Sequence, residues 1–212
     1  MKKHPTLYKV EQFSSIQDMV LKSVARYGDK IALEDLKETP IPKVTYNALL
    51  KNILKFGAAL QSLGINKRSH IAVIGENRVQ WGITYLTAMC FNHVIVPIDK
   101  NLTVNEIINI LHESDATAVV FSESFDAVFR EERHSLRRLR HFISMDLAAR
   151  KDDFYSMHEL ITQSHGCAID DLPKIRPEEL AVIIFTSGTV GRAKGVMLSQ
   201  KNIAANLISM RS

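Results

Sequence analysis

Short apolar segments alternate with amphipathic segments through most of the chain, and this alternation constrains the fold more than any other feature. It is typical of parallel β-α-β units, in which helices cover both faces of the sheet. We therefore expect an α/β fold with a doubly wound parallel sheet. Strands are predicted at 70–74, 93–98, 117–121 and 180–185, with shorter ones at 30–33, 43–46 and 141–144.

Capping residues mark several of the predicted helices. Ser15 precedes an apolar-periodic run that stops at Gly28, and the run over 47–63 stops at Gly64. Thr103 and Glu106 have the spacing of a capping box. Further helices are predicted at 77–91, 103–112, 125–132 and 156–162, with a turn at 39–42 and a connector at 173–180.

The loops that follow the predicted strands are the candidate ligand sites. In open parallel sheets, ligands bind beyond the carboxyl ends of the strands. We therefore expect the functional residues in the loops at 75–77, 97–100, 122–124 and 186–195.

Composition excludes several classes of protein. Of the 212 residues, 46% are hydrophobic and 24% are charged, which is a globular balance and not that of a disordered chain. The longest apolar runs fall far short of the ~20 residues that a membrane helix needs. No apolar stretch follows the basic residues at the start, so a secretory signal is not expected. With two cysteines and no disulfide framework, a cytoplasmic location is expected.

The basic residues do not predict nucleic-acid binding. The net charge is a mild +4, and five of the arginines lie between Arg130 and Arg140, beside Glu131 and Glu132. No aromatic residues are interleaved with them, so we interpret this segment as a solvated helix face or loop and expect no nucleic-acid partner.

The segment 185–196, which reads FTSGTVGRAKGV, carries the most chemistry. Glycines allow a ligand to approach main-chain amides closely, and successive amides in a turn form an anion site. Hydroxyl groups add donors, and a lysine adds a compact positive charge for phosphate oxygens. The composition therefore predicts a polyphosphate site. Its members are Thr186, Ser187, Gly188, Thr189, Gly191, Lys194 and Gly195.

Two common nucleotide motifs do not fit this segment. Counting from Gly188, the sixth position is Ala193, and Gly195 follows Lys194, so the spacing is not G-x-x-x-x-G-K-[ST]. The G-x-G-x-x-G dinucleotide fingerprint is also absent. A plain glycine-rich surface turn between two strands remains an alternative, because glycine and serine are common in turns for conformational reasons.

The segment resembles the phosphate-binding signature of the adenylate-forming superfamily, which includes acyl-CoA ligases, peptide-synthetase adenylation domains and firefly luciferase. The family pattern is roughly [YF]-T-S-G-[ST]-T-G-x-P-K-G-V, and ten of its twelve positions agree. VTYNAL at 44–49 and CFNHVIVPID at 90–99 resemble two earlier family segments, in the family order. GENRVQW at 75–81 is similar to members that act on fatty acids. The resemblance covers nearly the whole chain from about Phe13.

Two positions depart from the family pattern. Val190 stands where threonine is usual, so one hydroxyl donor is missing; a neutral hydrogen bond contributes about 0.5–1.5 kcal/mol, so weaker nucleotide binding is expected, not loss of function. Ala193 stands where proline is usual, which leaves φ free.

The resemblance implies adenylation followed by thioester formation. A carboxylate oxygen would attack the α-phosphate of ATP and release pyrophosphate, and the thiol of coenzyme A would then attack the acyl-adenylate. Lys194 would be the catalytic residue, and Thr186 would contribute a ligand to Mg²⁺, which takes only one or two protein ligands in such sites. The residues implied to bind the nucleotide are Thr186, Ser187, Gly188, Thr189, Val190, Gly191 and Lys194.

The resemblance also implies that residues 1–212 are one incomplete N-terminal α/β domain, ending just after the phosphate-binding loop at 186–195. In the family, the rest of the large domain and a small lid domain follow. We therefore expect a chain of these 212 residues not to make acyl-adenylate alone.

Fatty acid is the expected substrate class, with coenzyme A as co-substrate, and the resemblance leaves room for peripheral membrane association of the full-length protein. Three alternatives remain open. One is a nucleotide-binding regulatory module without chemistry, another is an aryl- or amino-acid-activating relative, and the third is a structural α/β domain with a glycine-rich turn.

Other chemistry-bearing side chains are interpreted as structural. The eight histidines show neither H-x-x-x-H nor H-E-x-x-H spacing, so no histidine metal site is expected. Trp81 and Cys90 are predicted to be core residues. Cys167 is predicted to lie in a loop without a nucleophilic role.

Overall fold

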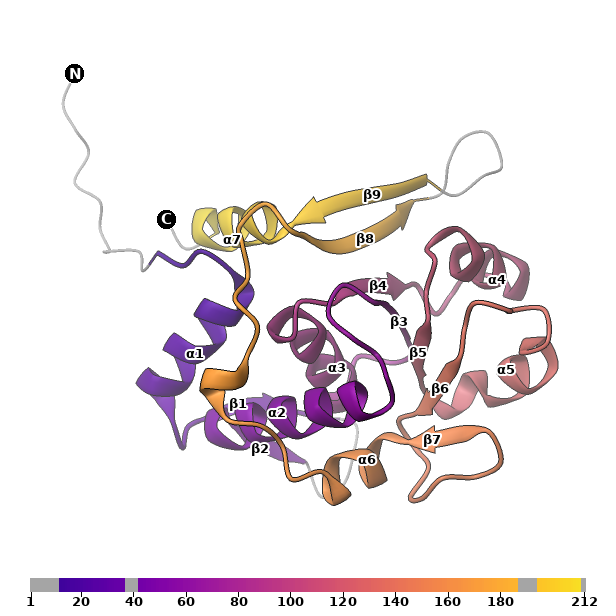
Figure 1. The fold of residues 1–212 in the computed structure, drawn as a ribbon, viewed down its shortest axis with the longest axis horizontal. Coiled ribbons are helices and arrows are strands. Elements are labelled where there is room, and N and C mark those ends of the chain that lie inside the picture. The colour runs from indigo at the N-terminus through magenta and orange to yellow at the C-terminus, as the bar shows by residue number, and fades with distance from the viewer. Residues whose placement is uncertain (1–11, 37–41, 187–193, 211–212) are drawn as a thin grey trace.

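The computed structural model describes residues 12–36, 42–186 and 194–210. In these ranges a seven-stranded sheet runs through the molecule between two layers of helices, and a separate two-stranded ribbon pairs β1 with β2 (Figure 1). The order across the large sheet is β7-β6-β5-β3-β4-β8-β9. Its neighbouring strands are parallel, except that β9 is antiparallel to β8. The predicted α/β fold is confirmed, and the antiparallel edge strand is an addition to it.

The elements have the following bounds. The strands are β1 (Ile31–Glu34), β2 (Lys43–Thr45), β3 (His70–Ile74), β4 (Val94–Ile98), β5 (Ala118–Phe121), β6 (His141–Ser144), β7 (Phe154–Ser156), β8 (Leu180–Thr186) and β9 (Lys194–Ser199). The α-helices are α1 (Ile16–Tyr27), α2 (Tyr46–Ser62), α3 (Val79–Cys90), α4 (Val104–Glu113), α5 (Asp126–Glu132), α6 (Met157–Gln163) and α7 (Gln200–Ser209). Short 3₁₀ turns lie at Glu123–Phe125 and Ile169–Asp171.

The helix starts follow from the capping residues. The Ser15 side chain accepts a hydrogen bond from the backbone N–H of Asp18 at 3.1 Å. Thr103 and Glu106 form the expected capping box at the start of α4. Predicted strands and helices therefore match within a few residues, although β7, β9 and α7 were not predicted. Most of the turn expected at 39–42 lies outside the described residues.

The central strands pack into two apolar cores, one on each face of the sheet. Ile71 and Val73 of β3 belong to the core that includes residues of α1, α2, α3 and α6. Ala72 and Ile74 of the same strand belong to the core that includes residues of α4 and α5. Because successive strand side chains point to opposite faces, a strand between two helix layers must be apolar throughout. This explains the near-continuous apolar runs in the sequence.

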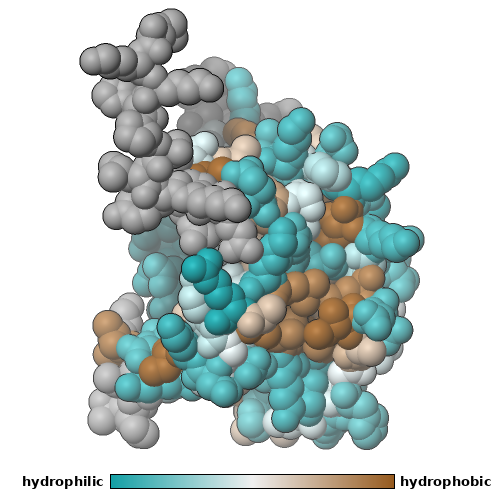
Figure 2. All heavy atoms as spheres, turned by 90° about the vertical axis from the view of Figure 1, so that its left-hand side faces the viewer, coloured by the Kyte–Doolittle hydropathy of each residue, from teal (hydrophilic) through white to brown (hydrophobic). Residues whose placement is uncertain are grey.

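Figure 2 views the molecule from the left-hand side of Figure 1, where α1 lies. Hydrophilic side chains cover much of this face, and a large hydrophobic area lies among them, with smaller ones around it (Figure 2). Lys22 and Arg26 on α1 are exposed, whereas Ile16 and Val20 are buried, so α1 is amphipathic as its sequence predicts. In the described ranges, no helix has both the length and the apolar character that a membrane crossing requires.

His93 is an unusual core residue at the start of β4. Its side chain is 0% exposed, and neither ring nitrogen has a hydrogen-bond partner of good geometry. Burial lowers the pKa of His93 from 6.5 to about 4, and the nearby backbone of Asn66 opposes this shift only weakly. The imidazole is therefore neutral in the folded protein at neutral pH.

Acid should destabilise the protein through His93. The unfolded chain binds a proton at this residue near pH 6.5, whereas the folded chain binds it only near pH 4. Below pH 6.5 the unfolded state therefore holds more protons, and its free energy falls relative to the folded state. We expect this residue alone to remove about 3 kcal/mol from the free energy of unfolding between these two pH values.

Urea unfolding of the wild type and of His93→Leu, measured from pH 7 to pH 4, checks this expectation. The variant should lose stability less steeply as the pH falls, and the exposed His165→Gln should follow the wild type. Equal pH slopes for the wild type and His93→Leu would contradict the assignment.

Candidate functional site

Strands β8 and β9 form a hairpin that carries the ends of the predicted phosphate-binding segment. β8 lies parallel to β4 in the sheet, and its residues Ala181, Val182 and Ile183 are buried. β9 returns antiparallel, so that Thr186 lies opposite Lys194. The buried part of β8 thus fixes the hairpin to the sheet, and the first and last polar residues of the segment are brought together.

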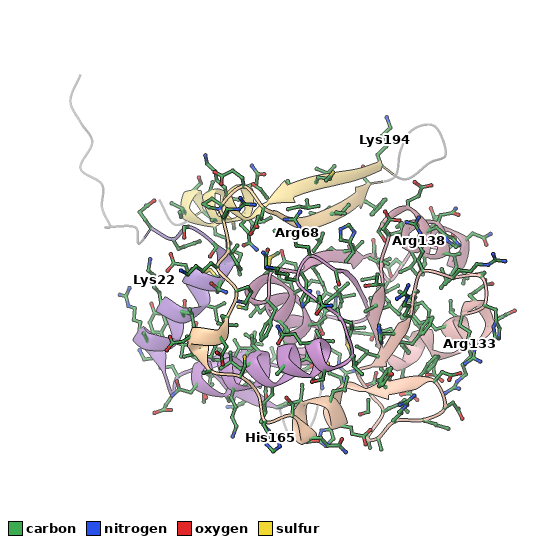
Figure 3. The ribbon with its side chains drawn as sticks, in the orientation of Figure 1. Lys22, Arg68, Arg133, Arg138, His165 and Lys194 are labelled. Atoms are coloured by element: carbon green, nitrogen blue, oxygen red, sulfur yellow. The ribbon has the colours of Figure 1, made fainter. Side chains whose placement is uncertain are left out.

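The structure describes two of the seven residues expected to bind the nucleotide. Thr186 and Lys194 are both exposed, and Lys194 lies at the far end of the hairpin with its side chain directed away from the body of the molecule (Figure 3). The remaining five residues, for which the binding expectation stays a prediction, lie outside the described ranges. They are Ser187, Gly188, Thr189, Val190 and Gly191.

Gly195 lets the two strands of the hairpin approach each other. A Cβ atom at this position would lie 2.9 Å from Cγ2 of Ile183 and 3.2 Å from the ring of Phe185. Because real Cβ contacts are longer than this, another residue at 195 would push β9 away from β8 and move Lys194 with it. The role of Gly195 shown by the structure is therefore to allow this close packing.

This arrangement fits a phosphate ligand and its magnesium ion. An ammonium group and a hydroxyl group lie on paired residues at the strand ends, and no described acidic side chain forms an ion pair with Lys194. Lys194 would bind phosphate oxygens as a point charge. Thr186 offers one neutral oxygen, which suits Mg²⁺ because this ion keeps several waters and binds substrate phosphates.

A second group of polar residues lies at the same edge of the sheet, beyond β3 and β5. The Ser124 hydroxyl donates to the Glu76 carboxylate at 3.2 Å, and the Ser122 and Ser124 hydroxyls are 2.8 Å apart. A hydrogen bond from Ser122 is the largest cause that lowers the pKa of Glu76; Ser124 and the positive charge of Lys100 contribute less. The carboxyl-end loops predicted from the sequence therefore meet here.

Gly75 permits the close approach of these two loops. Its φ is +152°, and a Cβ atom there would lie 2.9 Å from Cβ and Oγ of Ser122. Next along the edge, Arg78 forms an ion pair with Asp146, whose other oxygen accepts from the backbone N–H of Glu123 at 2.7 Å. Sequence analysis identified the loops but missed these contacts, which depend on the register between strands distant in sequence.

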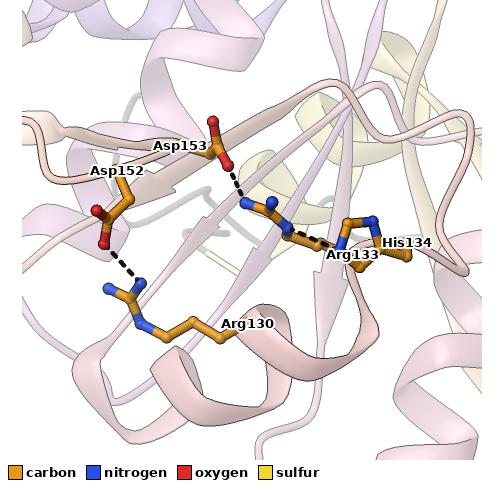
Figure 4. Close-up of a pocket in the computed structure, with 5 residues that line it drawn as sticks. All are labelled: Arg130, Arg133, His134, Asp152 and Asp153. Atoms are coloured by element: carbon orange, nitrogen blue, oxygen red, sulfur yellow. Dashed lines mark hydrogen bonds and ion pairs between the residues drawn. The ribbon is translucent and has the colours of Figure 1, made fainter.

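The arginine-rich segment lies elsewhere, on and after α5. There Arg130, Arg133, His134, Asp152 and Asp153 line an open depression of about 440 Å³ (Figure 4). Arg130 Nη1 lies 3.0 Å from Asp152 Oδ2, and Arg133 is paired with Asp153. Arg130 and Arg133 thus lie on a solvated helix face and the loop after it, as predicted, and the carboxylates that face their guanidinium groups balance their positive charge.

The cysteines and Trp81 occupy structural positions. Cys90 is fully buried, and burial raises the pKa of its thiol to about 12, so it is not a nucleophile. Burial also raises the pKa of Cys167, which lies in a loop. Trp81 is half-buried and stacks on Tyr85, with ring centroids 5.5 Å apart. In the part of the chain that the structure describes, no three metal-binding side chains of the His, Cys, Asp or Glu type come together.

Residues 20–212 match the model of the family described as "AMP-binding enzyme", which is most of the chain. The chain belongs to the AMP-binding enzyme family. The predicted resemblance to adenylate-forming enzymes is thereby confirmed.

Two curated relatives of this AMP-binding chain act on long-chain fatty acids according to their names. A long-chain-fatty-acid–[acyl-carrier-protein] ligase of Arabidopsis thaliana is 29% identical over 91% of this chain and 29% of its own length. A long-chain-fatty-acid–CoA ligase of Escherichia coli O157:H7 is 27% identical over 96% of this chain and 40% of its own length. The chain thus spans between about a quarter and two-fifths of the length of these relatives.

Solved structures share the fold. A long-chain-fatty-acid-CoA ligase of Archaeoglobus fulgidus superimposes with a TM-score of 0.81 at 22% identity, over 99% of this chain and 41% of the other. An anthranilate CoA ligase in complex with anthranoyl-AMP gives a TM-score of 0.80 at 18% identity, over 88% of this chain and 35% of the other. At these identities the similarity establishes the α/β fold of the AMP-binding family.

Proposed function

We propose that this protein, in its full length, is an ATP-dependent acyl-activating ligase that converts a fatty acid to its coenzyme A thioester. The observation that carries the proposal is the β8–β9 hairpin, which places Thr186 opposite Lys194 at the ends of a glycine-rich segment in an AMP-binding chain. The fatty-acid relatives support the substrate class, and the anthranilate ligase among the structural neighbours makes an aromatic acid the second candidate.

The proposed chemistry has two steps. A carboxylate oxygen forms a bond to the α-phosphorus of ATP while the bond to pyrophosphate breaks. The thiolate of coenzyme A then attacks the acyl carbonyl carbon, and AMP leaves with the electrons of the acyl–oxygen bond. Negative charge shifts onto phosphate oxygens in the first step, so fixed donors that face these oxygens lower the barrier.

Within this chain, Lys194 and Thr186 supply such donors. The Lys194 ammonium group binds phosphate oxygens and stabilises the charge that develops on pyrophosphate. The Thr186 hydroxyl binds either a phosphate oxygen or Mg²⁺, and this ion, when bound, neutralises part of the triphosphate charge. We propose the same phosphate-binding role for Ser187, Gly188, Thr189, Val190 and Gly191.

The proposal is tested by incubating the full-length protein with Mg-ATP and either palmitate or benzoate, and measuring pyrophosphate release. Coenzyme A and a phosphopantetheinylated acyl-carrier protein are then supplied separately, and the thioester is identified by mass spectrometry. We expect palmitate-dependent pyrophosphate release and palmitoyl-CoA. A preference for benzoate would show that the substrate is an aromatic acid and not a fatty acid. Transfer to the carrier protein alone would show that coenzyme A is not the acceptor. ATP binding without pyrophosphate release would instead indicate a regulatory module.

A further inference from the structure

The carboxyl ends of β5, β3, β4 and β8 and the amino end of β9 form one continuous edge beside the candidate phosphate site. Ile74 of β3 pairs with Ile98 of β4, and Ile95 of β4 pairs with Val182 of β8, so these strands are in register. The residues that follow β5, β3 and β4 therefore lie level with the last residue of β8 and the first residue of β9. In order along the edge they are Ser122, Gly75, Asp99, Thr186 and Lys194.

A tight turn presents Lys100 at this edge, immediately after β4. The Asp99 carboxylate accepts hydrogen bonds from the backbone N–H of Asn101 at 2.9 Å and from its side-chain Nδ2 at 3.0 Å. Two residues later, the capping box of Thr103 begins α4. The residues on either side of Lys100 are thus hydrogen-bonded to each other, and the Asp99 carboxylate binds Asn101 and not the Lys100 ammonium group.

Lys100 is an available cation on this edge. Its side chain is exposed, and no ion pair within 4.0 Å joins it to an acidic side chain in the described ranges. Glu76 lies near enough to interact with it electrostatically. Ser124, which is itself hydrogen-bonded to Ser122, holds the Glu76 carboxylate just beyond the end of β3, and Glu76 and Lys100 do not form an ion pair within 4.0 Å of each other in the described residues.

We propose that Lys100 binds a phosphate group of a ligand that lies along this edge, next to the hairpin that carries Thr186 and Lys194. The inference rests on the proposed function, which brings two phosphate-bearing molecules to the protein, namely ATP and coenzyme A. Glu76 positions the ammonium group in the absence of ligand, and its negative charge repels an incoming phosphate. The two residues should therefore affect affinity in opposite directions.

Isothermal titration of the full-length protein with Mg-ATP and with coenzyme A tests this assignment. Lys100→Met keeps the aliphatic side chain and removes the charge, and it should weaken binding of one of the two ligands about fivefold. Glu76→Gln should strengthen binding of the same ligand about twofold, because the amide can still bond to the serine hydroxyls. Both effects should shrink as NaCl is raised. The ligand that responds identifies the source of the phosphate.

Lys67→Met is the matched control, since Lys67 is also exposed but precedes β3 at the opposite edge of the sheet. If Lys100→Met binds both ligands as tightly as Lys67→Met does, the inference is wrong. In that case, weaker ATP binding by Lys194→Met would leave the proposed function intact. If the wild type binds neither ligand, the proposed function fails, and the role of Lys100 fails with it.

Discussion

Replacing Lys194 with methionine should lower the rate of acyl-adenylate formation about a hundredfold, the usual effect of removing one donor that stabilises transition-state charge. Methionine has a similar length and no charge. Lys194 is exposed at the start of β9 and pairs with Thr186 across the hairpin, so its removal leaves the apolar contacts of β8 in place. The loss should therefore appear mainly in kcat and not in the stability of the protein.

Pyrophosphate release by the full-length protein, measured at saturating ATP and fatty acid, gives this rate. Lys201→Met is the control, because Lys201 is also exposed but lies at the start of α7, at the other end of β9 from Lys194, where its backbone N–H donates to the carbonyl of Pro177. Its melting temperature and its rate should match the wild type. A Lys194→Met enzyme as fast as the Lys201→Met enzyme would contradict the catalytic role of Lys194.

Replacing Gly57 with alanine should destabilise the fold by about 3 kcal/mol, at the upper end of the cost of overpacking a core. Gly57 is buried in the middle of α2 and packs against Phe91, which directly follows the last residue of α3. A Cβ atom at Gly57 would lie 2.0 to 2.4 Å from three ring atoms of Phe91. Phe91 is itself only 2% exposed, so its ring cannot move aside into solvent. The helices α2 and α3 would have to separate.

Chemical denaturation of four proteins separates this clash from other effects. Phe91→Leu alone should cost stability because it leaves a cavity, but the double variant Gly57→Ala, Phe91→Leu should be more stable than the sum of the single changes predicts. Gly82→Ala is the matched control, since the added Cβ meets only Leu33 at 3.4 Å and alanine favours a helix. If Gly57→Ala is as stable as Gly82→Ala, the close packing of α2 on Phe91 is refuted.

Sequence patterns predicted most elements because the strands are buried on both faces. The predicted bounds of β3 and β6 match the structure at both ends, and each has adjacent apolar residues that are buried, Ile71–Ile74 in β3 and Phe142 and Ile143 in β6. The three-residue strand β7 has no such run and exists because its backbone pairs with β6. β9 begins with Lys194 and Gly195, and its strand conformation comes from pairing with β8. Such backbone pairing leaves no periodic signal in the sequence of the strand itself.

At the candidate site, too, the sequence predicted which loops take part but not the contacts between them. The order of strands and loops predicted that the residues at the carboxyl ends of β3, β4, β5 and β8 would lie at one edge, and the structure places the residues after β3, β4 and β5 and the last residue of β8 there. The hydrogen bond from Ser124 to Glu76 could not be predicted, since it joins side chains whose proximity depends on the register of β3 and β5. Local composition identified the glycine-rich segment, whereas the pairing of Thr186 with Lys194 came from the structure.

The position of β8 in the sheet has a consequence for the order of folding. Ile95 of β4 pairs with Val182 of β8, although β5, β6 and β7 and their helices lie between these residues in the sequence. Contacts between such distant segments form slowly, because the intervening chain must first lose much of its freedom. We therefore expect the hairpin to dock after the central strands have assembled. Thr186 and Lys194, for which we propose phosphate binding, would then reach their positions only in chains that have nearly completed folding.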